Sequence, residues 1–332
     1  MAINQNKAVI MMTTYNGAKY VEEQLNSLEN QTFHNWDLYI SDDGSSDQTL
    51  QILEKYMAQD DRIKKILHHS DHHGAFNNFY NVMRYVKSLP NENYQYFFYC
   101  DQDDIWINEK MAIEIERLAD EAQPSLCYSA LEFMTAEGKD TKTKMSESTN
   151  IDVTGNPYNL FFSYRYIWGT TMAHNRQLWE QVYVDENTEK YNMSHDNYIG
   201  KYAAMTGKIK FIDRPLVLYR RTGNNVSGTP GNYGKLGMLK RLFTKLPQIV
   251  NQHAAVYWDD LYFIETLSKQ NDFSTELQTA LNNGGIKSLQ FLKKYEIKTS
   301  NSVISNASIK TILLFKLYKY TKTFKRKMSF QN

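Results

Sequence analysis

The stretch Tyr96-Phe97-Phe98-Tyr99-Cys100-Asp101-Gln102-Asp103-Asp104-Ile105-Trp106 joins an apolar run to three acidic residues within four positions. The apolar run lacks any polar alternation, which is typical of a strand buried on both faces of a parallel sheet. The acids therefore follow the carboxyl end of that strand, where open α/β sheets bind ligands. Carboxylates packed so closely repel one another, and a divalent cation carrying a phosphate would offset their charge. A solvated acidic turn that caps the next helix is the alternative.

Apolar strand-like segments and amphipathic helical segments alternate along the first part of the chain. Each expected strand is followed by a segment with apolar residues at helical spacing. The expected strands are residues 8–12, 38–40, 66–67 and 96–100. Four strand-helix repeats with short connections imply right-handed crossovers. They predict an α/β fold with a Rossmann-like, mostly parallel sheet and flanking helices.

The rest of the chain changes character near residue 226. Before that point, further strands are expected at residues 126–134, 209–212 and 216–219, and a polar loop at residues 136–150. Beyond it, a glycine-containing stretch leads into a pattern that is helical and basic. We therefore expect an α/β domain of residues 1–225 and a helical, basic C-terminal region of residues 226–332.

The composition restricts the kinds of partner that are expected. The net charge of +1 gives no whole-molecule reason to expect nucleic acid as a partner. The only two cysteines, Cys100 and Cys127, lie in apolar runs and fit free thiols in a reducing compartment. No apolar run approaches the length needed to cross a bilayer. A cytoplasmic protein is expected.

A second pair of acids, Asp42 and Asp43, closes the second expected strand as Asp101 and Asp103 close the fourth. The carboxyl ends of parallel strands meet at one edge of a sheet, so both groups should converge on one cleft. Helix capping explains Asp47, but it does not explain doubled acids at two strand ends. A nucleoside diphosphate bound with a metal ion would explain both groups together.

Four of the eight histidines lie between residues 68 and 73, which suggests a metal cluster. Adjacent histidines on a strand point to opposite faces, and no cysteine or further acid has the usual ligand spacing. A polar loop at a strand end is therefore the preferred interpretation, with zinc as the alternative.

Asp196 begins another expected helix, where a carboxylate interacts favourably with the helix dipole. The same carboxylate, next to His195, could take a proton from an attacking hydroxyl if a diphosphate cleft lies nearby. Arg220 and Arg221 stand beside a glycine turn, where a guanidinium could bind phosphate or simply remain in solvent.

Five segments in the same order resemble family 2 glycosyltransferases of the GT-A fold, over roughly the first 230 residues. These segments are residues 9–17, 41–47, 101–106, 195–196 and 219–228. Within that family, the form Asp-Gln-Asp-Asp-Ile-Trp and the Asn-Asn-Val ending are similar to bacterial rhamnosyltransferases. Those enzymes build cell-wall or capsular polysaccharides.

The resemblance implies roles for individual residues. Donor-binding roles fall on Thr13, Tyr15, Asp42, Asp43, Asp101 and Arg220, and the first four of these would hold the base and ribose. Asp103 and Asp101 would bind Mn²⁺ or Mg²⁺, with Asp103 as the first candidate for direct contact. Asp196 matches the catalytic base of inverting members. Trp106, Gly169, Thr170 and His195 are placed near the acceptor. The family often has histidine where this chain has Thr222, which leaves the strength of metal binding open.

The expected activity is inverting transfer of a sugar from a nucleotide-diphosphate donor to a hydroxyl of a growing cell-surface glycan. L-rhamnose from dTDP-rhamnose is the candidate donor, and a lipid-linked glycan is the candidate acceptor. A homodimer is left open. A nucleotidyltransferase is one alternative, although residues 13–17 lack the glycine- and lysine-rich phosphate loop that it would need. A non-catalytic glycan-binding or scaffold protein is another, and it would need neither Asp196 nor a metal.

The C-terminus is strongly basic. After Glu296 there is no acid, and eight lysine and arginine residues follow. At helical spacing, Ile309, Leu313, Leu317, Tyr320 and Phe324 share one face. This pattern predicts a basic amphipathic helix and peripheral contact with an anionic membrane, at the inner face of the plasma membrane. The alternative is a helix that packs on the rest of the protein.

Overall fold

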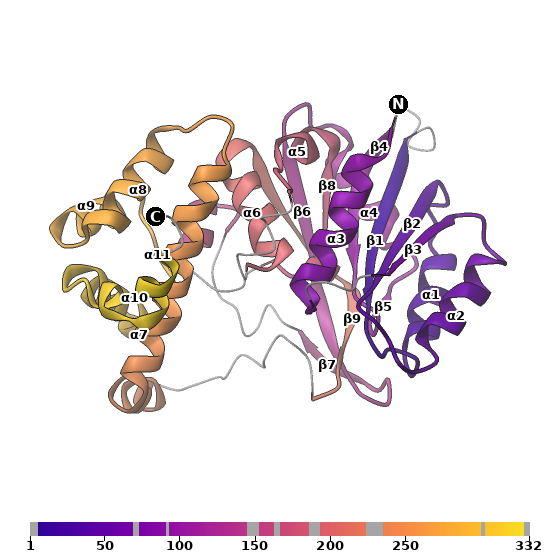
Figure 1. Cartoon of the computed structure of the whole chain (residues 1–332), viewed down its shortest axis with the longest axis horizontal. Coiled ribbons are helices and arrows are strands. Elements are labelled where there is room, and N and C mark those ends of the chain that lie inside the picture. Colours follow the sequence, from indigo (N-terminus) through magenta and orange to yellow (C-terminus); the bar gives the residue numbers. More distant parts are fainter. Residues whose placement is uncertain are drawn as a thin grey trace. The chain divides into compact units, whose positions relative to one another are not determined.

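The computed structural model describes residues 6–68, 73–90, 93–144, 153–162, 167–185, 193–223, 235–299 and 303–328. The chain divides into two compact units, shown in Figure 1. The first unit comprises residues 1–147 and 167–228, and the second comprises residues 148–166 and 229–332. Each unit is described by itself below.

Four parallel strands with their crossover helices form the first half of the first unit. The strands are β1 (Lys7–Thr14), β2 (Trp36–Asp42), β3 (Ile63–His68) and β4 (Tyr94–Cys100). They lie in the order β3-β2-β1-β4, and every neighbouring pair is parallel. The helices that connect or follow them are α1 (Val21–Glu29), α2 (Thr49–Met57), α3 (Ala75–Ser88) and α4 (Lys110–Ala119). The four predicted strand-helix repeats are confirmed.

The second half of the sheet is mixed. Its strands are β5 (Ile105–Trp106), β6 (Ser125–Thr135), β7 (Asp140–Lys144), β8 (Met172–Asn175) and β9 (Lys208–Arg221). Strand β8 is antiparallel to both β4 and β6, whereas β9 runs parallel to β6 and pairs with β5 in antiparallel fashion. The whole sheet is therefore mostly parallel, as predicted.

Two local predictions in this half of the sheet are wrong. Residues 209–212 and 216–219 are not separate strands but parts of β9, whose pairing with β6 skips from Ile212 to Pro215. The supposed polar loop at residues 136–150 contains β7, which forms a hairpin with β6. Because β7 consists of threonine, lysine and aspartate at the sheet margin, it has no apolar period to reveal it.

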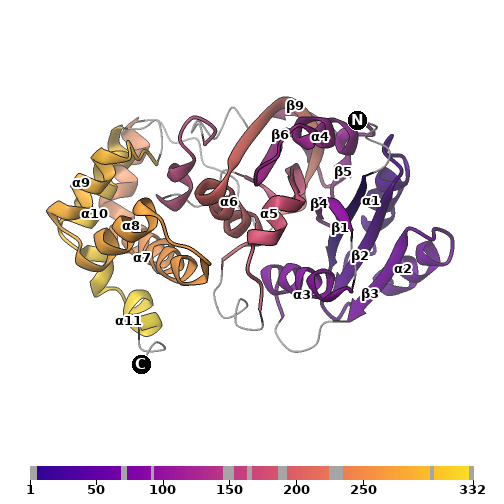
Figure 2. The same cartoon turned by 90° about the horizontal axis from the view of Figure 1, so that it is seen from above.

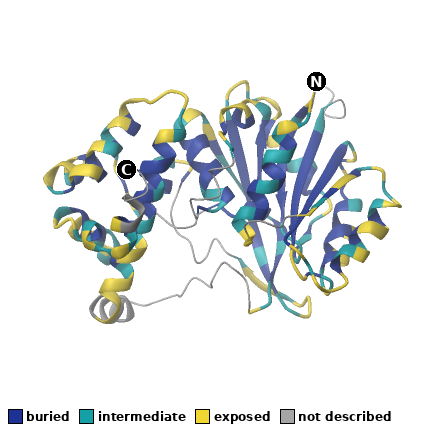
Figure 3. Ribbon diagram, viewed as in Figure 1, coloured by how far each residue is buried: buried dark blue, intermediate teal, exposed yellow. Residues whose placement is uncertain are grey.

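Helices cover both faces of this sheet (Figure 2), and its strands are largely buried (Figure 3). Helices α1, α2 and α4 pack on the face that carries Ala8, Ile10 and Met12. The opposite face is covered by α3, α5 (Arg176–Gln181) and α6 (His195–Thr206). There the ring of Phe97 stacks on Trp179 with centroids 4.6 Å apart. Burial on both faces explains the continuous apolar run of β4.

The strand register brings the carboxyl ends of three strands to one edge of the sheet. Thr14 of β1 is opposite Asp42 of β2, and Met12 of β1 is opposite Cys100 of β4. The acids that follow β2 and β4 are therefore neighbours across β1, as the sequence predicts.

The second unit is helical in the residues that the structure describes. Its elements are η3 (Pro157–Phe162), α7 (Lys235–Thr266), α8 (Asp272–Asn283), α9 (Ile286–Lys294), α10 (Val303–Leu314), η6 (Leu317–Tyr320) and α11 (Lys322–Met328). Helix α7 is kinked at Lys245, two residues before Pro247. The short segment that contains η3 belongs to this unit because its rings enter the helical core. Tyr158 stacks on Phe273 at 3.8 Å, and Phe161 lies 5.6 Å from Phe263.

The predicted amphipathic membrane helix near the C-terminus is wrong as a single helix. The chain turns at Lys316, which has φ 56°, so α10, η6 and α11 are three separate short segments. Ile309, Leu313 and Phe324 of the predicted apolar face are buried inside the unit. Packing within the unit therefore takes up most of the face that was expected to meet lipid, although Tyr320 remains exposed. Among the described residues, no helix is both long and apolar enough to cross a membrane.

Candidate active site

The loops that follow β1 and β4 are joined through Gln102. Its Oε1 accepts a hydrogen bond from the backbone N–H of Tyr15 at 2.8 Å, and its Nε2 donates to the Tyr15 carbonyl at 3.0 Å. Gly17 allows this approach, since a Cβ on Gly17 would lie 2.1 Å from Oε1 of Gln102. The Tyr15 side chain itself is 54% exposed, so its ring is free to meet a ligand at the edge of the sheet.

Asp42 lies at the end of β2 and has no exposed surface. Its carboxylate accepts hydrogen bonds from the Thr14 hydroxyl at 2.7 Å and from the Ser45 hydroxyl at 2.6 Å. The backbone N–H groups of Gly44 and Ser45 donate to it as well. Asp42 therefore holds the loop after β2 against β1. The structure thus shows Asp42 as a residue that positions this loop.

Asp43 is turned toward the loop that precedes α3. Its Oδ1 lies 2.9 Å from Nδ1 of His73, and its Oδ2 accepts a hydrogen bond from the backbone N–H of Gly74 at 2.8 Å. The His73 side chain is 66% exposed, whereas that of Asp43 is 6% exposed. The rest of the predicted histidine loop, residues 69–72, lies outside the described residues. Thr13, the remaining predicted contact of the base and ribose, is buried at the end of β1.

The acids after β4 share one poorly solvated neighbourhood. Burial, followed by the charges of Asp103 and Asp196, raises the pKa of Asp101 to about 7. Burial likewise raises the pKa of Asp103 to about 6, although the Arg220 guanidinium opposes that shift. For Asp104, burial and the two neighbouring acids raise the pKa well above its usual range. These carboxylates are therefore hard to ionise together unless a positive group joins them.

Arg220 does not extend toward an open cleft. Its side chain is 1% exposed and bonds to protein groups throughout. Nε donates to the Asp103 carbonyl at 2.8 Å, and Nη2 donates to Oε2 of Glu23 at 2.7 Å. The backbone N–H of Arg220 donates to Oδ1 of Asp104 at 3.1 Å. This arginine therefore holds the acidic turn in place, and the predicted direct contact with the donor has no free nitrogen to make it.

Asp196 stands in the first turn of α6, where it faces the loop before β8. Its Oδ2 accepts a hydrogen bond from the Gly169 backbone N–H at 3.2 Å, and its Oδ1 accepts from the Asn197 N–H at 2.6 Å. The helix is capped at Ser194, so Asp196 is not the capping residue. Thr170, the residue after Gly169, accepts a hydrogen bond from Trp106, which follows the acids of β4 by two residues. Asp196 is therefore linked to those acids through the loop before β8, and its charge contributes to the raised pKa of Asp101.

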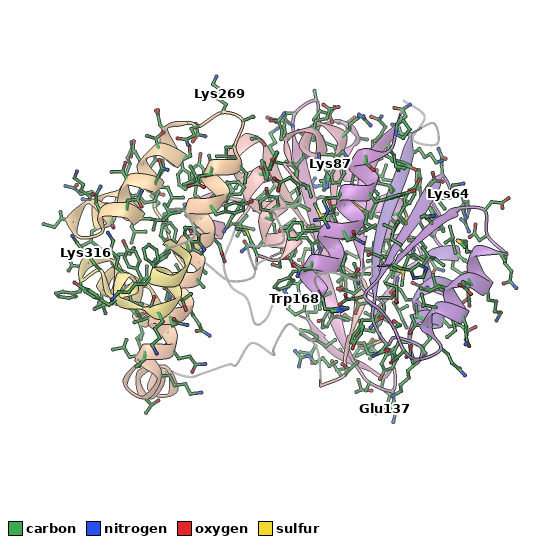
Figure 4. All side chains as sticks on the ribbon, viewed as in Figure 1. Lys64, Lys87, Glu137, Trp168, Lys269 and Lys316 are labelled. Atoms are coloured by element: carbon green, nitrogen blue, oxygen red, sulfur yellow. The ribbon has the colours of Figure 1, made fainter. Side chains whose placement is uncertain are left out.

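Trp106 and Thr170 are joined beside this carboxylate, since the indole Nε1 donates to Oγ1 of Thr170 at 3.2 Å. Trp106 is 1% exposed and Thr170 is 1% exposed, so both support the site from within. Trp106 also lies under the buried Lys110 ammonium, which is 4.2 Å from its ring centroid. Trp168, labelled in Figure 4, precedes this loop and packs at right angles to the ring of Tyr219, at 4.7 Å.

His195 lies behind the same loop. Its ring packs against that of Phe79 with centroids 3.7 Å apart and a tilt of 31°, and it lies 5.1 Å from the ring of Tyr99. Burial lowers the pKa of His195 to about 4, so the imidazole is neutral at pH 7. A Cβ on Gly169 would lie 2.3 Å from Nε2 of His195. Only glycine fits at position 169, and the His195 ring packs behind the loop before β8 that contains Gly169.

The donor set at this edge suits a metal ion only in part. Among the described residues, no group of three or more histidine, cysteine, aspartate or glutamate side chains could hold a metal ion alone. Asp101 and Asp103 nevertheless offer two hard oxygen ligands, and a cation would stabilise their ionised forms because burial raises the pKa of both carboxyls. Mg²⁺ is typically held by one or two carboxylates together with substrate phosphates. The residues therefore fit an ion that arrives with a diphosphate.

Several residues that build the site were not predicted from the sequence. Gln102 and Glu23 each join segments that lie far apart in the chain, and Asn78 donates from α3 to the Thr14 carbonyl at 3.1 Å. The position of Gln102 between Asp101 and Asp103 could have indicated a role in the site. Glu23 and Asn78 lie on helices among other polar residues, so their sequence context gave no such indication.

The mostly parallel curled sheet, its flanking helices and the acids at its carboxyl edge define the first unit as a glycosyltransferase with the GT-A fold. Residues 9–224 match the family model described as glycosyl transferase family 2. The chain therefore belongs to glycosyl transferase family 2.

Known proteins agree with this assignment. The chain is 29% identical to dTDP-rhamnosyl transferase RfbG of Shigella flexneri over 269 residues, which cover 78% of this chain and 88% of that one. It is 31% identical over 110 residues to UDP-Glc:alpha-D-GlcNAc-diphosphoundecaprenol beta-1,3-glucosyltransferase WfgD of Escherichia coli, covering 33% and 40% of the two chains. The solved structure of S. aureus TarS 1–349 with UDP-GlcNAc aligns with a TM-score of 0.53 and 17% identity. That alignment covers 86% of this chain and 73% of TarS 1–349, and it shows the shared fold.

Proposed function

We propose that this protein is an inverting glycosyltransferase in which Asp196 is the general base. One observation supports the proposal: Asp101 and Asp103 follow β4, Asp196 stands in the first turn of α6, and the charges of Asp103 and Asp196 both act on Asp101. Asp101 and Asp103 follow β4, where a diphosphate would enter, and Asp196 faces them from α6. In this arrangement Asp101 and Asp103 would bind the charged diphosphate with its cation, and Asp196 would accept the proton of the attacking hydroxyl.

The transfer is a single displacement. The acceptor hydroxyl oxygen attacks the anomeric carbon of the donor sugar, and its proton passes to a carboxylate oxygen of Asp196. The bond between the anomeric carbon and the diphosphate oxygen breaks, and both electrons leave with the nucleoside diphosphate. The configuration at the anomeric carbon is inverted. The hydrogen bonds from Gly169 and Asn197 hold the Asp196 carboxylate in place.

Asp101 and Asp103 would hold Mn²⁺ or Mg²⁺ together with the donor diphosphate. Such an ion, when bound, offsets the negative charge that grows on the departing diphosphate. Arg220 holds the acidic turn after β4 in position through its hydrogen bonds to Asp103 and Asp104. Thr222 occupies the position where the family often has a further histidine ligand, so this chain relies on the two carboxylates.

We further propose a dTDP-L-rhamnose donor and a lipid-linked, cell-surface glycan acceptor, used at the cytoplasmic side of the membrane. The name of the Shigella flexneri relative, a dTDP-rhamnosyl transferase, supports the donor. The name of the Escherichia coli relative, which acts on a diphosphoundecaprenol acceptor, supports the lipid link. Tyr15 and Asp43, with positioning help from Asp42 and Thr13, would meet the nucleoside.

The test is a panel of nucleotide sugars incubated with the protein, manganese and candidate lipid-linked acceptors. We expect dTDP-rhamnose to release dTDP faster than any other donor. Release of a different nucleoside diphosphate would keep the glycosyltransferase and correct the donor. Formation of a nucleoside triphosphate and a sugar phosphate from a nucleotide sugar and added pyrophosphate would indicate a nucleotidyltransferase. No release from any donor would contradict the proposed activity.

A further inference from the structure

The second unit exposes large apolar side chains at one corner. Ile286 is 67% exposed, Phe315 is 64% exposed and Tyr320 is 73% exposed. Exposed apolar side chains that lie near one another can mark an interaction site, and the turns that carry these three contact each other. We call the set formed by these three residues, Lys287 and Lys316 the basic corner.

Two turns that meet each other build the basic corner. One turn precedes α9 and contains Gly284 and Gly285, both with positive φ. The other is the left-handed turn at Lys316. The backbone N–H of Gly285 donates to the Leu313 carbonyl at 2.9 Å, and a Cβ on Gly284 would lie 2.7 Å from Cγ of Lys316. Ile286 and Phe315 each lie next to these contacts in the chain.

Tyr318 and Lys319, which lie in the chain between Phe315 and Tyr320, are fixed by contacts inside the unit. The Tyr318 ring is fully buried, lies 5.1 Å from the Tyr257 ring, and its hydroxyl bonds to the Leu281 carbonyl. Lys319 bonds to the carbonyl of Asn282, at the end of α8. Because Tyr318 and Lys319 are anchored in this way, the exposure of Phe315 and Tyr320 on either side of them is a feature of the packed fold (Lys316 is labelled in Figure 4).

Positive charge surrounds this apolar surface. Between Leu277 and the C-terminus the chain has a single acid, Glu296, and eleven lysine and arginine residues. Lys287, Lys316, Lys322 and Lys325 are exposed. Apolar and aromatic tips among lysines suit a surface that is anionic at its boundary and apolar just beneath. A bilayer containing anionic lipid has both properties.

We propose that the basic corner docks this protein on an anionic phospholipid surface, with Ile286, Phe315 and Tyr320 entering the headgroup region. This differs from an inserted amphipathic helix, because Ile309, Leu313 and Phe324 of the predicted apolar face are buried in the unit and only its Tyr320 takes part in the basic corner. The proposal does not depend on the sugar, the acceptor or the catalytic role of Asp196. Each lysine near an anionic surface contributes roughly fivefold to binding.

The first test is sedimentation of the full-length protein with two kinds of vesicle, pure phosphatidylcholine and a mixture of phosphatidylglycerol with phosphatidylcholine. We expect binding to the anionic vesicles only, and binding that weakens as salt is added. Two double variants should each weaken it at least tenfold: Phe315→Ser with Tyr320→Ser, and Lys287→Glu with Lys316→Glu. The controls are Tyr183→Ser, another exposed tyrosine, and Lys65→Glu, an exposed lysine of β3. Both controls should bind like the unchanged protein.

The second test reports the depth of one residue. Cys100 and Cys127 are buried, so Phe315→Cys introduces an accessible thiol for a polarity-sensitive dye. The dye at position 315 should shift to the blue on anionic vesicles, and the same dye on Tyr183→Cys should not.

Three results would overturn the proposal. The first is failure of the unchanged protein to sediment with anionic vesicles at low salt, and the second is sedimentation of the corner variants equal to that of the controls. An acidic protein that binds the corner while vesicles do not would assign this surface to a protein partner instead. Circular dichroism melts of all variants separate loss of binding from loss of folding.

Discussion

The backbone N–H of Gly169 donates a hydrogen bond to Oδ2 of Asp196 at 3.2 Å. This bond joins the loop before β8 to the first turn of α6, across 27 residues of sequence. The other carboxylate oxygen, Oδ1, accepts a hydrogen bond from the neighbouring Asn197 N–H at 2.6 Å, so both oxygens are held. The proposed base is thus oriented by backbone groups, which do not depend on any side chain.

Replacing the proposed base should separate catalysis from stability. Asp196→Asn should lower kcat by a hundredfold or more, because a general base typically contributes about 10²- to 10⁴-fold. The asparagine side chain has a single carbonyl oxygen, so it replaces the two backbone hydrogen bonds of Asp196 only in part. A small loss of thermal stability is therefore expected. Asp272→Asn, in the first turn of α8, is the matched control and should retain full activity. An Asp196→Asn enzyme that turns over at nearly the normal rate would show that the carboxylate is only structural.

Gln102→Leu should weaken donor binding and leave the fold intact. Leucine has a similar size but cannot make the two hydrogen bonds to the Tyr15 backbone, so the loop after β1 loses its fixed position. We expect the Kd for the nucleoside diphosphate to rise about tenfold, which corresponds to roughly 1.4 kcal/mol. Gln95→Leu on β4 serves as the control. Titration calorimetry with the nucleoside diphosphate measures both, and unchanged affinity in Gln102→Leu would disprove this role.

Arg220→Lys should destabilise the protein more than it weakens donor binding. Lysine cannot reproduce the separate bonds to Glu23 and the Asp103 carbonyl, and a buried acceptor left without its donor costs about 1–3 kcal/mol. Arg221→Lys, the adjacent residue whose guanidinium lies over the Phe133 ring, is the comparison. Urea unfolding and diphosphate titration are measured on both. A large loss of diphosphate affinity at unchanged stability would restore Arg220 as a direct donor ligand.

Metal dependence should act through Asp103. Asp103→Asn removes one of the two carboxylates that could meet the ion, so activity should fall at least a hundredfold and excess manganese should recover only part of it. Nucleoside diphosphate binding by the unchanged enzyme should tighten when manganese is added, and this gain should be lost in the variant. Full activity of the unchanged enzyme in the presence of a chelator would remove the metal from the reaction.

Stability should fall as the solution becomes acidic, through buried histidines. Burial lowers the pKa of His174 from 6.5 to about 3, so the unfolded chain binds a proton that the folded chain rejects. The free energy of unfolding is therefore highest above pH 6.5 and falls toward pH 3, by about 1.4 kcal/mol per pH unit for this histidine. His174→Asn should show a shallower fall in urea unfolding than the unchanged protein, and exposed His34→Asn should not. Equal slopes for His174→Asn and the unchanged protein would exclude this source of acid sensitivity.

The sequence predicted the strands that have a strong local signal. Residues 96–100 form a continuous apolar run, and Asp101 and Asp103 end it abruptly, so both the strand and the acidic edge could be inferred. Strand β8 has four residues, and β7 carries no apolar side chain, so neither has a pattern long enough to recognise.

The environments of the site residues could not be predicted in the same way. Arg220 and Asp103 are 117 residues apart, and nothing near Arg220 in the sequence says that its guanidinium is buried. The pattern at Ile309 and Leu313 was read correctly as apolar, but a pattern of this kind is the same whether the face meets lipid or protein. Only the positions of α7 and the neighbouring helices decide between the two.

The passage of residues 153–162 through the helical unit has a consequence for how this protein can be taken apart. Tyr158 and Phe161 pack on Phe273, so the second unit is completed by a segment that lies in the sequence between the two parts of the first unit. Cutting the chain after residue 228 would therefore not give a complete second unit, because the C-terminal fragment would lose the contacts of Phe273 with Tyr158 and Phe161. Exchange of the C-terminal part between related enzymes, in the laboratory or during evolution, therefore has to carry an internal insert along with the tail.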